Sequence, residues 1–141
     1  MKNFLENNKD LGILALRLGV GCAFALIYGM MKIKMGPEMW TMIGQSMGNF
    51  GISFAPTFWG FMATMSEFGG GILLVLGLFV RPAAAFMAFT MIVATSTHLK
   101  MQDQWYNVIQ PVEMLAVFIC LIFLGAGKYS LDYLFFKKNK A

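Results

Sequence analysis

The chain has 141 residues, of which 58% are hydrophobic and 13% are charged, and its formal net charge is +4. Soluble proteins average about 25% charged residues, so this composition excludes an ordinary soluble domain and predicts a small integral membrane protein. The basic residues stand at the ends of apolar runs and form no basic stripe, which excludes a nucleic-acid-binding role. The length leaves room for a single membrane domain, residues 1–141.

The first apolar run, residues 11–31, is long enough to cross a bilayer as a helix. It carries one charge, Arg17, and the polar residues before it include Asn7, Asn8 and Asp10 as candidate helix caps. A long connection rich in Gly, Ser and Asn follows. Within it, the apolar spacing of residues 39–47 predicts a short interfacial helix that lies flat on the membrane as a lid.

The second apolar run, residues 57–80, has Glu67 as its single formal charge. An acid near the middle of a membrane costs at least ~2.5 kcal/mol unless it faces protein, a polar cavity or a partner. Three glycines, Gly69 to Gly71, follow it, and small residues on one face allow another helix to approach closely. We therefore expect Glu67 to face inward at a contact between helices.

A very short connection separates the second and third spans. Arg81-Pro82 interrupts the apolar pattern and predicts a tight turn, after which residues 83–99 form the third span. A turn of this length makes the two spans antiparallel neighbours.

The fourth span, predicted over residues 111–126, is the shortest. We expect Pro111 to be its first helical residue, with Trp105 and Tyr106 in an aromatic belt before it. The alternative is a helix that already includes Trp105 and holds Pro111 in its interior. After this span, Ser130 is a candidate cap for a helix in the amphipathic tail, residues 131–141, whose lysines suit an anionic membrane surface.

The basic residues outside the spans predict the orientation. Seven lie on the side of the termini and three on the other: Lys2, Lys9, Arg81, Lys128, Lys137, Lys138 and Lys140 against Lys32, Lys34 and Lys100. The positive-inside rule then places both termini in the cytoplasm. The predicted fold is an all-α integral membrane four-helix bundle that crosses the cell membrane, of the bacterial inner or plasma type, four times.

Each span carries one stripe of polar residues, which predicts a partly polar bundle interior with most of its chemistry in the outer half. Glu67, His98 and Glu113 are the candidate catalytic residues, because carboxylates and histidine transfer protons. The candidate ligand-binding residues are Arg17, Tyr28, Lys32, Thr64 and Thr95. The alternative roles are structural. Arg17 snorkels toward the headgroups, and Glu67 makes a buried hydrogen bond. Tyr28 and Lys32 anchor the helix at the interface, and His98 and Glu113 are solvated near the span ends. Whether Arg17 and Glu67 pair directly stays open.

The sequence offers no signature for metal or thiol chemistry. Cys22 and Cys120 lie in different spans and form no C-x-x-C motif, so we expect two buried, inert thiols. The 13 methionines are scattered over core and loop positions, where filling apolar gaps explains them better than copper binding does. We predict no metal site and no built-in cofactor.

Several short motifs, in this order and spacing, resemble those of the DoxX family. They are Arg17-Leu-Gly19, Tyr28-Gly-Met-Met-Lys32, Glu67-Phe-Gly-Gly-Gly71, Leu76-Gly-Leu-Phe-Val-Arg-Pro-Ala-Ala84, the segment 91–98, Glu113-Met-Leu-Ala116 and Gly125-Ala-Gly-Lys-Tyr-Ser-Leu-Asp132. Tyr28 stands where the family's first motif often has His, so this chain lacks a proton carrier at that position. The resemblance implies a four-span membrane protein linked to redox work. Some relatives are the membrane subunit of a thiosulfate:quinone oxidoreductase, and others partner soluble thiol or superoxide enzymes in oxidative-stress complexes.

These features favour a membrane subunit of a redox complex whose pocket, open at the outer leaflet, binds a quinone or another lipophilic molecule. Glu67, relayed by His98 or Glu113, is then expected to take up the protons of a quinol. Electrons come from a soluble or membrane redox partner or directly from a substrate. One alternative is a non-enzymatic scaffold or assembly factor that recruits a soluble redox enzyme. The other is a small transporter, which requires a homo-oligomer because one four-span unit is too small to alternate access.

Overall fold

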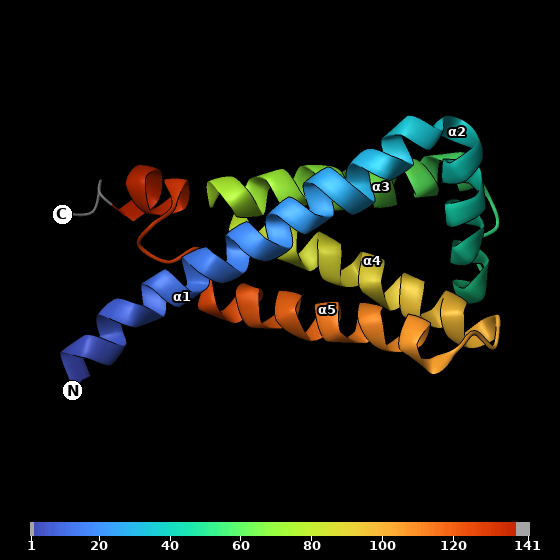
Figure 1. Ribbon diagram of the computed structural model, residues 1–141. Helices are drawn as coiled ribbons and strands as arrows, with labels where there is room; N and C mark the ends of the chain where they lie inside the picture. Colours follow the sequence, from blue (N-terminus) through green and yellow to red (C-terminus); the bar gives the residue numbers. More distant parts are fainter. Residues whose placement is uncertain (1, 138–141) are drawn as a thin grey trace.

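The computed structural model describes residues 2–137, with side chains from residue 8 to residue 136. All of its regular structure is helical, and no strand occurs within this range. Along the chain (Figure 1), the elements are α1 (Lys2–Cys22), the π-helical segment η1 (Ala23–Gly29), α2 (Met30–Gly44), the 3₁₀ segment η2 (Gln45–Phe50), α3 (Pro56–Leu76), α4 (Val80–Lys100), α5 (Trp105–Leu124) and the π-helical segment η3 (Tyr133–Lys137). Four stretches in this part of the chain are long and apolar enough to cross a membrane, which confirms the predicted all-α, four-span fold.

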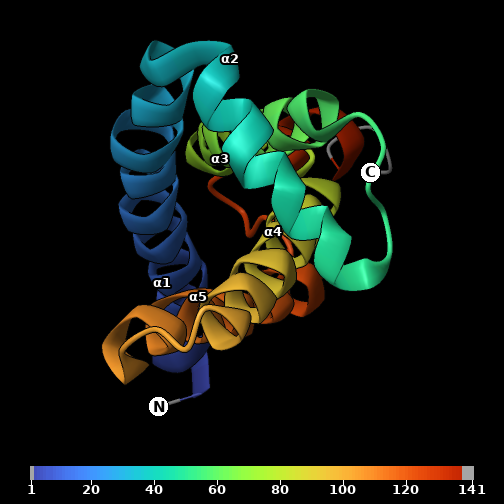
Figure 2. The ribbon, with the colours of Figure 1, turned by 90° about the vertical axis from the view of Figure 1, so that its right-hand side faces the viewer.

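The first span belongs to a helix that is much longer than predicted. α1 begins at Lys2, so the prediction that Asn7, Asn8 or Asp10 caps it is wrong, and it continues through η1 into α2. The chain changes direction at Gly36, whose backbone angles of φ 73° and ψ −159° are non-helical. Glycine adopts a positive φ without steric cost. The segment after this break and η2 together cross one end of the bundle, as the predicted lid helix should (Figure 2).

Glycines bring the first half of the chain very close to α3. A β-carbon added to Gly71 would lie 2.6 Å from the backbone nitrogen of Ala25, and one added to Gly29 would lie 2.6 Å from the Cα of Phe68. At the lid, a β-carbon on Gly60 would lie 1.6 Å from the carbonyl oxygen of a lid residue. Real side chains cannot occupy these positions, so only glycine allows this packing. The prediction that small residues beside Glu67 permit a close helix contact is confirmed.

The connection between α3 and α4 lies before Arg81-Pro82, and the predicted position of this turn is therefore wrong. Gly77 and Phe79 adopt left-handed angles, with φ of 68° and 49°, and α4 already begins at Val80. Pro82 falls in the first turn of α4, where its missing N–H breaks no helical hydrogen bond. Both carboxylate oxygens of Asp132 accept backbone N–H groups here, from Phe79 at 2.8 Å and from Val80 at 3.1 Å.

The fourth span starts earlier than predicted. α5 begins at Trp105 and contains Pro111 in its interior, so the expectation that Pro111 starts the helix is wrong and the alternative is correct. Beyond α5, Ser130 Oγ accepts the backbone N–H of Tyr133 at 3.1 Å, which confirms Ser130 as the cap of the tail helix. The rest of the predicted tail, residues 138–141, lies outside the described residues.

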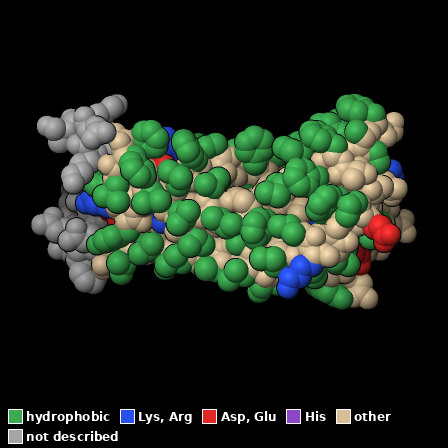
Figure 3. Space-filling model, turned by 90° about the horizontal axis from the view of Figure 1, so that it is seen from above, with side chains coloured by type: hydrophobic (Ala, Val, Ile, Leu, Met, Phe, Trp, Pro, Cys, Tyr) green, Lys and Arg blue, Asp and Glu red, His purple; other side chains and the backbone are tan. Residues whose placement is uncertain are grey.

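The core lies where α3, α4 and α5 meet the η1 end of the first helix. Its fully enclosed side chains include Leu74, Val80, Met87, Phe118 and Leu121, and Phe24 of η1 packs edge-on against Phe118. The exterior is apolar. On the face seen in Figure 3, hydrophobic side chains cover the middle of the molecule and charged ones gather toward its two ends. This distribution suits a protein that is surrounded by lipid.

The two cysteines differ from the prediction. Cys22 and Cys120 are both free and both exposed on the outer surface of the helices. Small apolar residues on the exterior of a membrane protein contact lipid, so burial was the wrong expectation for these thiols.

α1 starts and η3 ends at the same end of the molecule (Figure 1).

Candidate functional site

Glu67 forms an ion pair with Lys32 inside the bundle. The carboxylate projects from the middle of α3, and Lys32 comes from the first turn of α2. Lys32 Nζ lies 2.5 Å from Glu67 Oε2, and the two side chains are 20% and 4% exposed. A buried charge is tolerated when it is paired and hydrogen-bonded. Lys32 is therefore the partner that the mid-membrane acid requires.

Arg17 is the second buried charge, and it lies toward the other end of the bundle. It is 1% exposed. Its guanidinium donates to the carbonyl oxygens of Leu74 and Tyr129, each at 3.0 Å, and to that of Ala126. Carbonyl oxygens at helix ends have no helical partner, and the five N–H groups of arginine suit them. The open question of an Arg17–Glu67 pair is thus answered: each residue has another partner.

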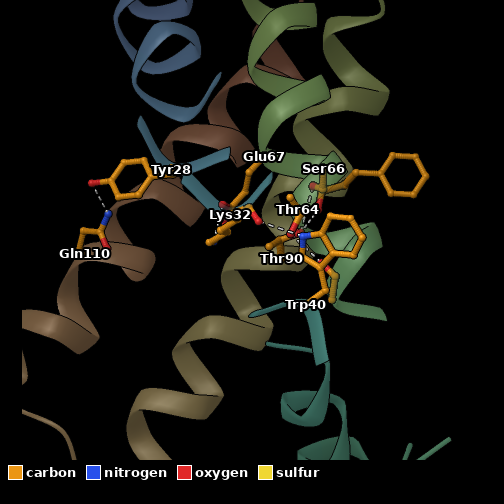
Figure 4. A network of polar contacts seen from close by, with 10 residues as sticks. Tyr28, Lys32, Trp40, Thr64, Ser66, Glu67, Thr90 and Gln110 are labelled. Atoms are coloured by element: carbon orange, nitrogen blue, oxygen red, sulfur yellow. Dashed lines mark hydrogen bonds and ion pairs between the residues drawn. The ribbon is translucent and has the colours of Figure 1, made fainter. Parts of the chain in front are cut away.

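A cavity of about 170 Å³ adjoins the ion pair. α3 and α4 form its walls, and the lid, which consists of the part of α2 after Gly36 and of η2, covers one end. Its polar lining consists mainly of Lys32, Ser46, Ser66, Glu67 and Thr90, and the remainder is largely apolar. Ser66 Oγ and Thr90 Oγ1 lie 3.0 Å apart and bridge the two walls. Figure 4 shows Lys32, Glu67, Ser66 and Thr90 gathered on the same side of the network.

One donor in the cavity wall lacks an acceptor. The indole Nε1 of Trp59 is buried and has no hydrogen-bond partner among the described residues. The other indole near the site, that of Trp40, donates to the carbonyl oxygen of Lys32 at 3.0 Å and fixes the lid to the helix that carries the lysine. A buried N–H group without an acceptor costs about 1–3 kcal/mol, so Trp59 is the unsatisfied polar residue of the cavity wall.

The cavity reaches the outer surface between α3 and α4. Three of its lining residues, Met62, Phe86 and Phe89, are 42%, 63% and 51% exposed. These side chains belong to the apolar exterior, which lipid surrounds in a membrane. The exposed side of the cavity therefore faces sideways, toward the acyl chains.

The other predicted ligand-binding residues do not line this cavity. Tyr28 Oη accepts a hydrogen bond of 3.0 Å from Gln110 of α5 and turns away from Lys32 (Figure 4). Thr64, which is fully buried, and Thr95 each donate to the carbonyl four residues earlier in their own helix, at 2.8 Å. Such bonds satisfy a hydroxyl within its helix and leave no free donor.

His98 and Glu113 lie apart from Glu67. His98 lies in the last turn of α4, where its Nδ1 is 2.9 Å from Asp103 Oδ2 in the following loop. Glu113 is exposed on α5, on the same face as the exposed Ala116 and Cys120. The expectation that Glu113 belongs to a polar stripe in the interior is therefore wrong. The structure does not bring the three predicted catalytic residues together.

The loop between α4 and α5 carries its own hydrogen-bond network. The pKa of Asp103 is lowered, chiefly because the side chains of Asn107 and His98 and the backbone N–H of Gln104 donate hydrogen bonds to its carboxylate. Hydrogen bonds to the charged form favour that form. The arrangement orders the loop, and the described side chains contain no group of three His, Cys, Asp or Glu residues placed to hold a metal ion.

Sequence reasoning missed three polar residues that line the cavity together with Glu67, namely Trp59, Ser66 and Thr90. Ser66 and Thr90 are hydroxyl residues inside apolar spans, which is the one signal that pointed to them. Nothing in the sequence distinguishes Trp59, whose indole N–H lacks an acceptor, from the two other tryptophans.

Comparison with known families and proteins places this arrangement in context. The DoxX family matches residues 12–99, which is more than half of the chain. The chain belongs to the DoxX family. The matched region contains both members of the ion pair and the whole cavity lining, whereas α5 lies beyond it. Searches of curated proteins and of solved structures gave no match. This DoxX protein is thus a multi-pass membrane protein whose buried ion pair and cavity lie within the family region.

Proposed function

We propose that this DoxX protein is a subunit of a membrane redox complex and that its lateral cavity binds the ring of a quinone or a similar lipophilic molecule. The observation that carries the proposal is the composition of the cavity wall. An apolar lining surrounds a buried Lys32–Glu67 pair and the acceptor-free N–H of Trp59. Small-molecule sites typically combine an apolar lining with a few converging polar groups in this way.

The volume of the cavity limits what it can enclose. Engineered protein cavities of about 150 Å³ bind benzene, whereas sites that enclose a whole drug-sized ligand measure about 300–1,000 Å³. At about 170 Å³, this cavity fits one six-membered ring. The hydrocarbon tail of a membrane quinone would leave through the opening beside Phe86 and Phe89 and stay among the lipids. A ring bound in this way explains why the cavity is small and open at its side.

The polar groups match the chemistry of a quinone. Its two carbonyl oxygens are acceptors, and Trp59 and Lys32, which both line the cavity, carry N–H donors. Reduction of a quinone to a quinol consumes two electrons and two protons. We assign the electrons to a redox partner protein, and the protons to solvent, delivered through the Lys32–Glu67 pair. In the reverse direction the same pair would accept the two protons that the quinol releases.

Charge distribution supports a cavity in the outer leaflet. The cavity lies at the lid end of the bundle, opposite the end where α1 begins and η3 ends (Figure 1). Because Lys32 is paired inside the bundle, it no longer counts as a loop charge. Only Lys34 and Lys100 remain on the lid side, against seven basic residues on the side of the termini. This asymmetry favours cytoplasmic termini in a bacterial-type inner or plasma membrane.

The proposal is tested by equilibrium binding of a short-chain quinone to the purified protein in detergent, with W59F and E67Q as variants. Losing one hydrogen bond removes about 0.5–1.5 kcal/mol, so W59F should bind roughly 2- to 13-fold more weakly. E67Q should also weaken binding. The matched controls are W105F and E113Q, because both residues are exposed on α5 away from the cavity. Binding that is unchanged in W59F and E67Q, or equally weakened in the controls, contradicts the proposal.

Assembly with another membrane protein is a second role that the outer face of α5 favours. Glu113 is exposed about 12 Å along the helix from Trp105, at eight residues of about 1.5 Å each. An acid at that depth on a lipid-facing surface is costly, and the small residues Ala116 and Cys120 beside it permit close contact with another helix. Oxidative cross-linking at Cys120 in native membranes tests this role. A homodimer, or a product with one redox protein, supports it, and an unlinked monomer contradicts it.

A further inference from the structure

A second and larger cleft lies at the opposite end of the bundle from the Lys32–Glu67 pair. It has a volume of about 730 Å³. Residues of α1, of the turn between α3 and α4, of the loop after α5, and of η3 line it. These four segments meet at the end of the molecule where α1 begins and η3 ends (Figure 1). The cleft has no part in the quinone proposal.

The two carboxylates in this cleft already have partners. Both oxygens of Asp132 accept backbone N–H groups at the start of α4. Asp10 Oδ1 accepts the backbone N–H of Lys128 at 3.0 Å, and Asp10 Oδ2 lies 3.6 Å from Lys128 Nζ. Both anionic groups therefore serve the fold, and the helix end that could attract an anion is already capped by Asp132.

The cations in the cleft are more available. Arg81 and Lys9 are exposed, and the structure records no hydrogen bond or ion pair for either side chain within the described range. Arg81 lies over the loop after α5, since a β-carbon built on Gly125 would be 3.3 Å from its Nε. Lys128 is only loosely paired, with a side chain that is 60% exposed. Three cations from three segments thus line a cleft whose acids are occupied.

The rim of the cleft is apolar. Phe79 and Phe136 are 51% and 57% exposed, and their ring centroids lie 6.0 Å apart. Leu124, on the last turn of α5, is 43% exposed. These side chains continue the lipid-facing surface of the bundle up to the edge of the cleft. A molecule that fills this cleft must therefore present an anion to Arg81 and hydrocarbon to the rim.

We propose that this cleft is a binding site for an anionic phospholipid. The headgroup phosphate lies between Arg81 and Lys9, with Lys128 at its side, and the acyl chains run along Phe79, Leu124 and Phe136. Arginine recognises phosphate through its planar set of N–H donors, and basic pockets at the ends of membrane helices suit anionic lipid headgroups. The volume of about 730 Å³ is ample for a headgroup and the start of its chains.

The site is tested by native mass spectrometry of the purified protein after exchange into nanodiscs that contain phosphatidylglycerol, phosphatidylcholine or an equal mixture. The wild-type protein should retain phosphatidylglycerol in preference to phosphatidylcholine. R81Q and K9Q should each reduce that preference roughly fivefold, because a cation near an anionic lipid surface contributes about 1 kcal/mol. Both side chains are exposed and make no recorded hydrogen bond or ion pair within the described range, so both variants are expected to fold.

Two further arms separate the specific site from general attraction and from a free anion. K34Q and K100Q remove lysines at the lid end and should leave the lipid preference unchanged. Inorganic phosphate at millimolar concentration should not displace the lipid, since it offers nothing to the apolar rim. Equal retention of both lipids, unchanged preference in R81Q and K9Q, equal losses in the lid-end controls, or displacement by inorganic phosphate would each overturn the proposal.

Discussion

Removing one charge of the Lys32–Glu67 pair should destabilise the protein strongly. In K32M, the Glu67 carboxylate stays 4% exposed and loses its counter-ion and its only recorded hydrogen bond within the described residues. Loss of one member of a buried pair costs about 3–5 kcal/mol. Because Lys32 keeps 20% of its side chain exposed, we expect the lower end, about 3 kcal/mol for K32M, and about 2 kcal/mol for E67Q, which retains an acceptor.

A double-mutant cycle measures whether the two charges act as a pair. Replacing both members of a buried ion pair by neutral groups is often nearly neutral, so K32M/E67Q should be less destabilised than the sum of the single variants, with a coupling energy of about 1.5–3 kcal/mol. The free energy of unfolding in detergent is the quantity to compare across the four proteins. K34M serves as the control for a nearby exposed lysine. Single-variant effects that add within about 0.5 kcal/mol would refute the reasoning.

Three further predictions concern other parts of the fold. R17M should lower the free energy of unfolding by at least about 3 kcal/mol, because the carbonyl oxygens of Ala126 and Tyr129 lose their guanidinium donor and that of Leu74 keeps only the backbone N–H of Gly77; a thermal unfolding shift equal to that of an exposed arginine variant would contradict it. G60A should separate the lid from α3 and cost more than 3 kcal/mol or prevent folding, whereas G48A, where a β-carbon meets open space, should cost less than about 1 kcal/mol; similar melting temperatures for both would be inconsistent with the packing. The ionised carboxylate of Asp103 stabilises the loop between α4 and α5 at pH values above 3.8, the ordinary pKa of the group. This stabilisation should be lost as the pH falls below 3.8 and through the lowered pKa of Asp103 in the folded protein. Pepsin cleavage of the loop should rise over that pH range in the wild-type protein but not in D103N.

The sequence was sufficient for the features that follow from apolar length and helical spacing. The inward position of Glu67 and its glycine-rich contact follow from the cost of a charge in lipid and from the need for small residues at a close contact. The antiparallel arrangement of the second and third spans follows from the short connection between them. Ser130 as a cap follows from its place before the tail helix.

Features that depend on long-range placement could not be predicted. Regular helical spacing puts Arg17, Tyr28 and Lys32 on one face, but the π-helical segment Ala23–Gly29 rotates the residues after it relative to those before it. In the structure, Tyr28 meets α5 while Lys32 meets Glu67. Local residue preferences do not encode a π-helix in any recognisable way. The outward position of Glu113 was missed for a related reason, because a stripe of polar and small residues does not reveal whether its partner belongs to the same chain.

The partners of Arg17 also have a consequence for the order of synthesis. The guanidinium enters the membrane with the first helix, but Ala126 lies 109 residues later in the chain and Tyr129 follows it. At about 5–20 residues per second, the ribosome needs roughly 5–20 s to supply those two carbonyl groups. During this interval the first helix carries a charge whose native acceptors are largely missing. The hydrogen bonds of Arg17 to the chain after the last helix therefore stabilise the first helix only once the last helix has been inserted. A protein truncated before residue 126 lacks these acceptors and should be degraded by quality-control proteases.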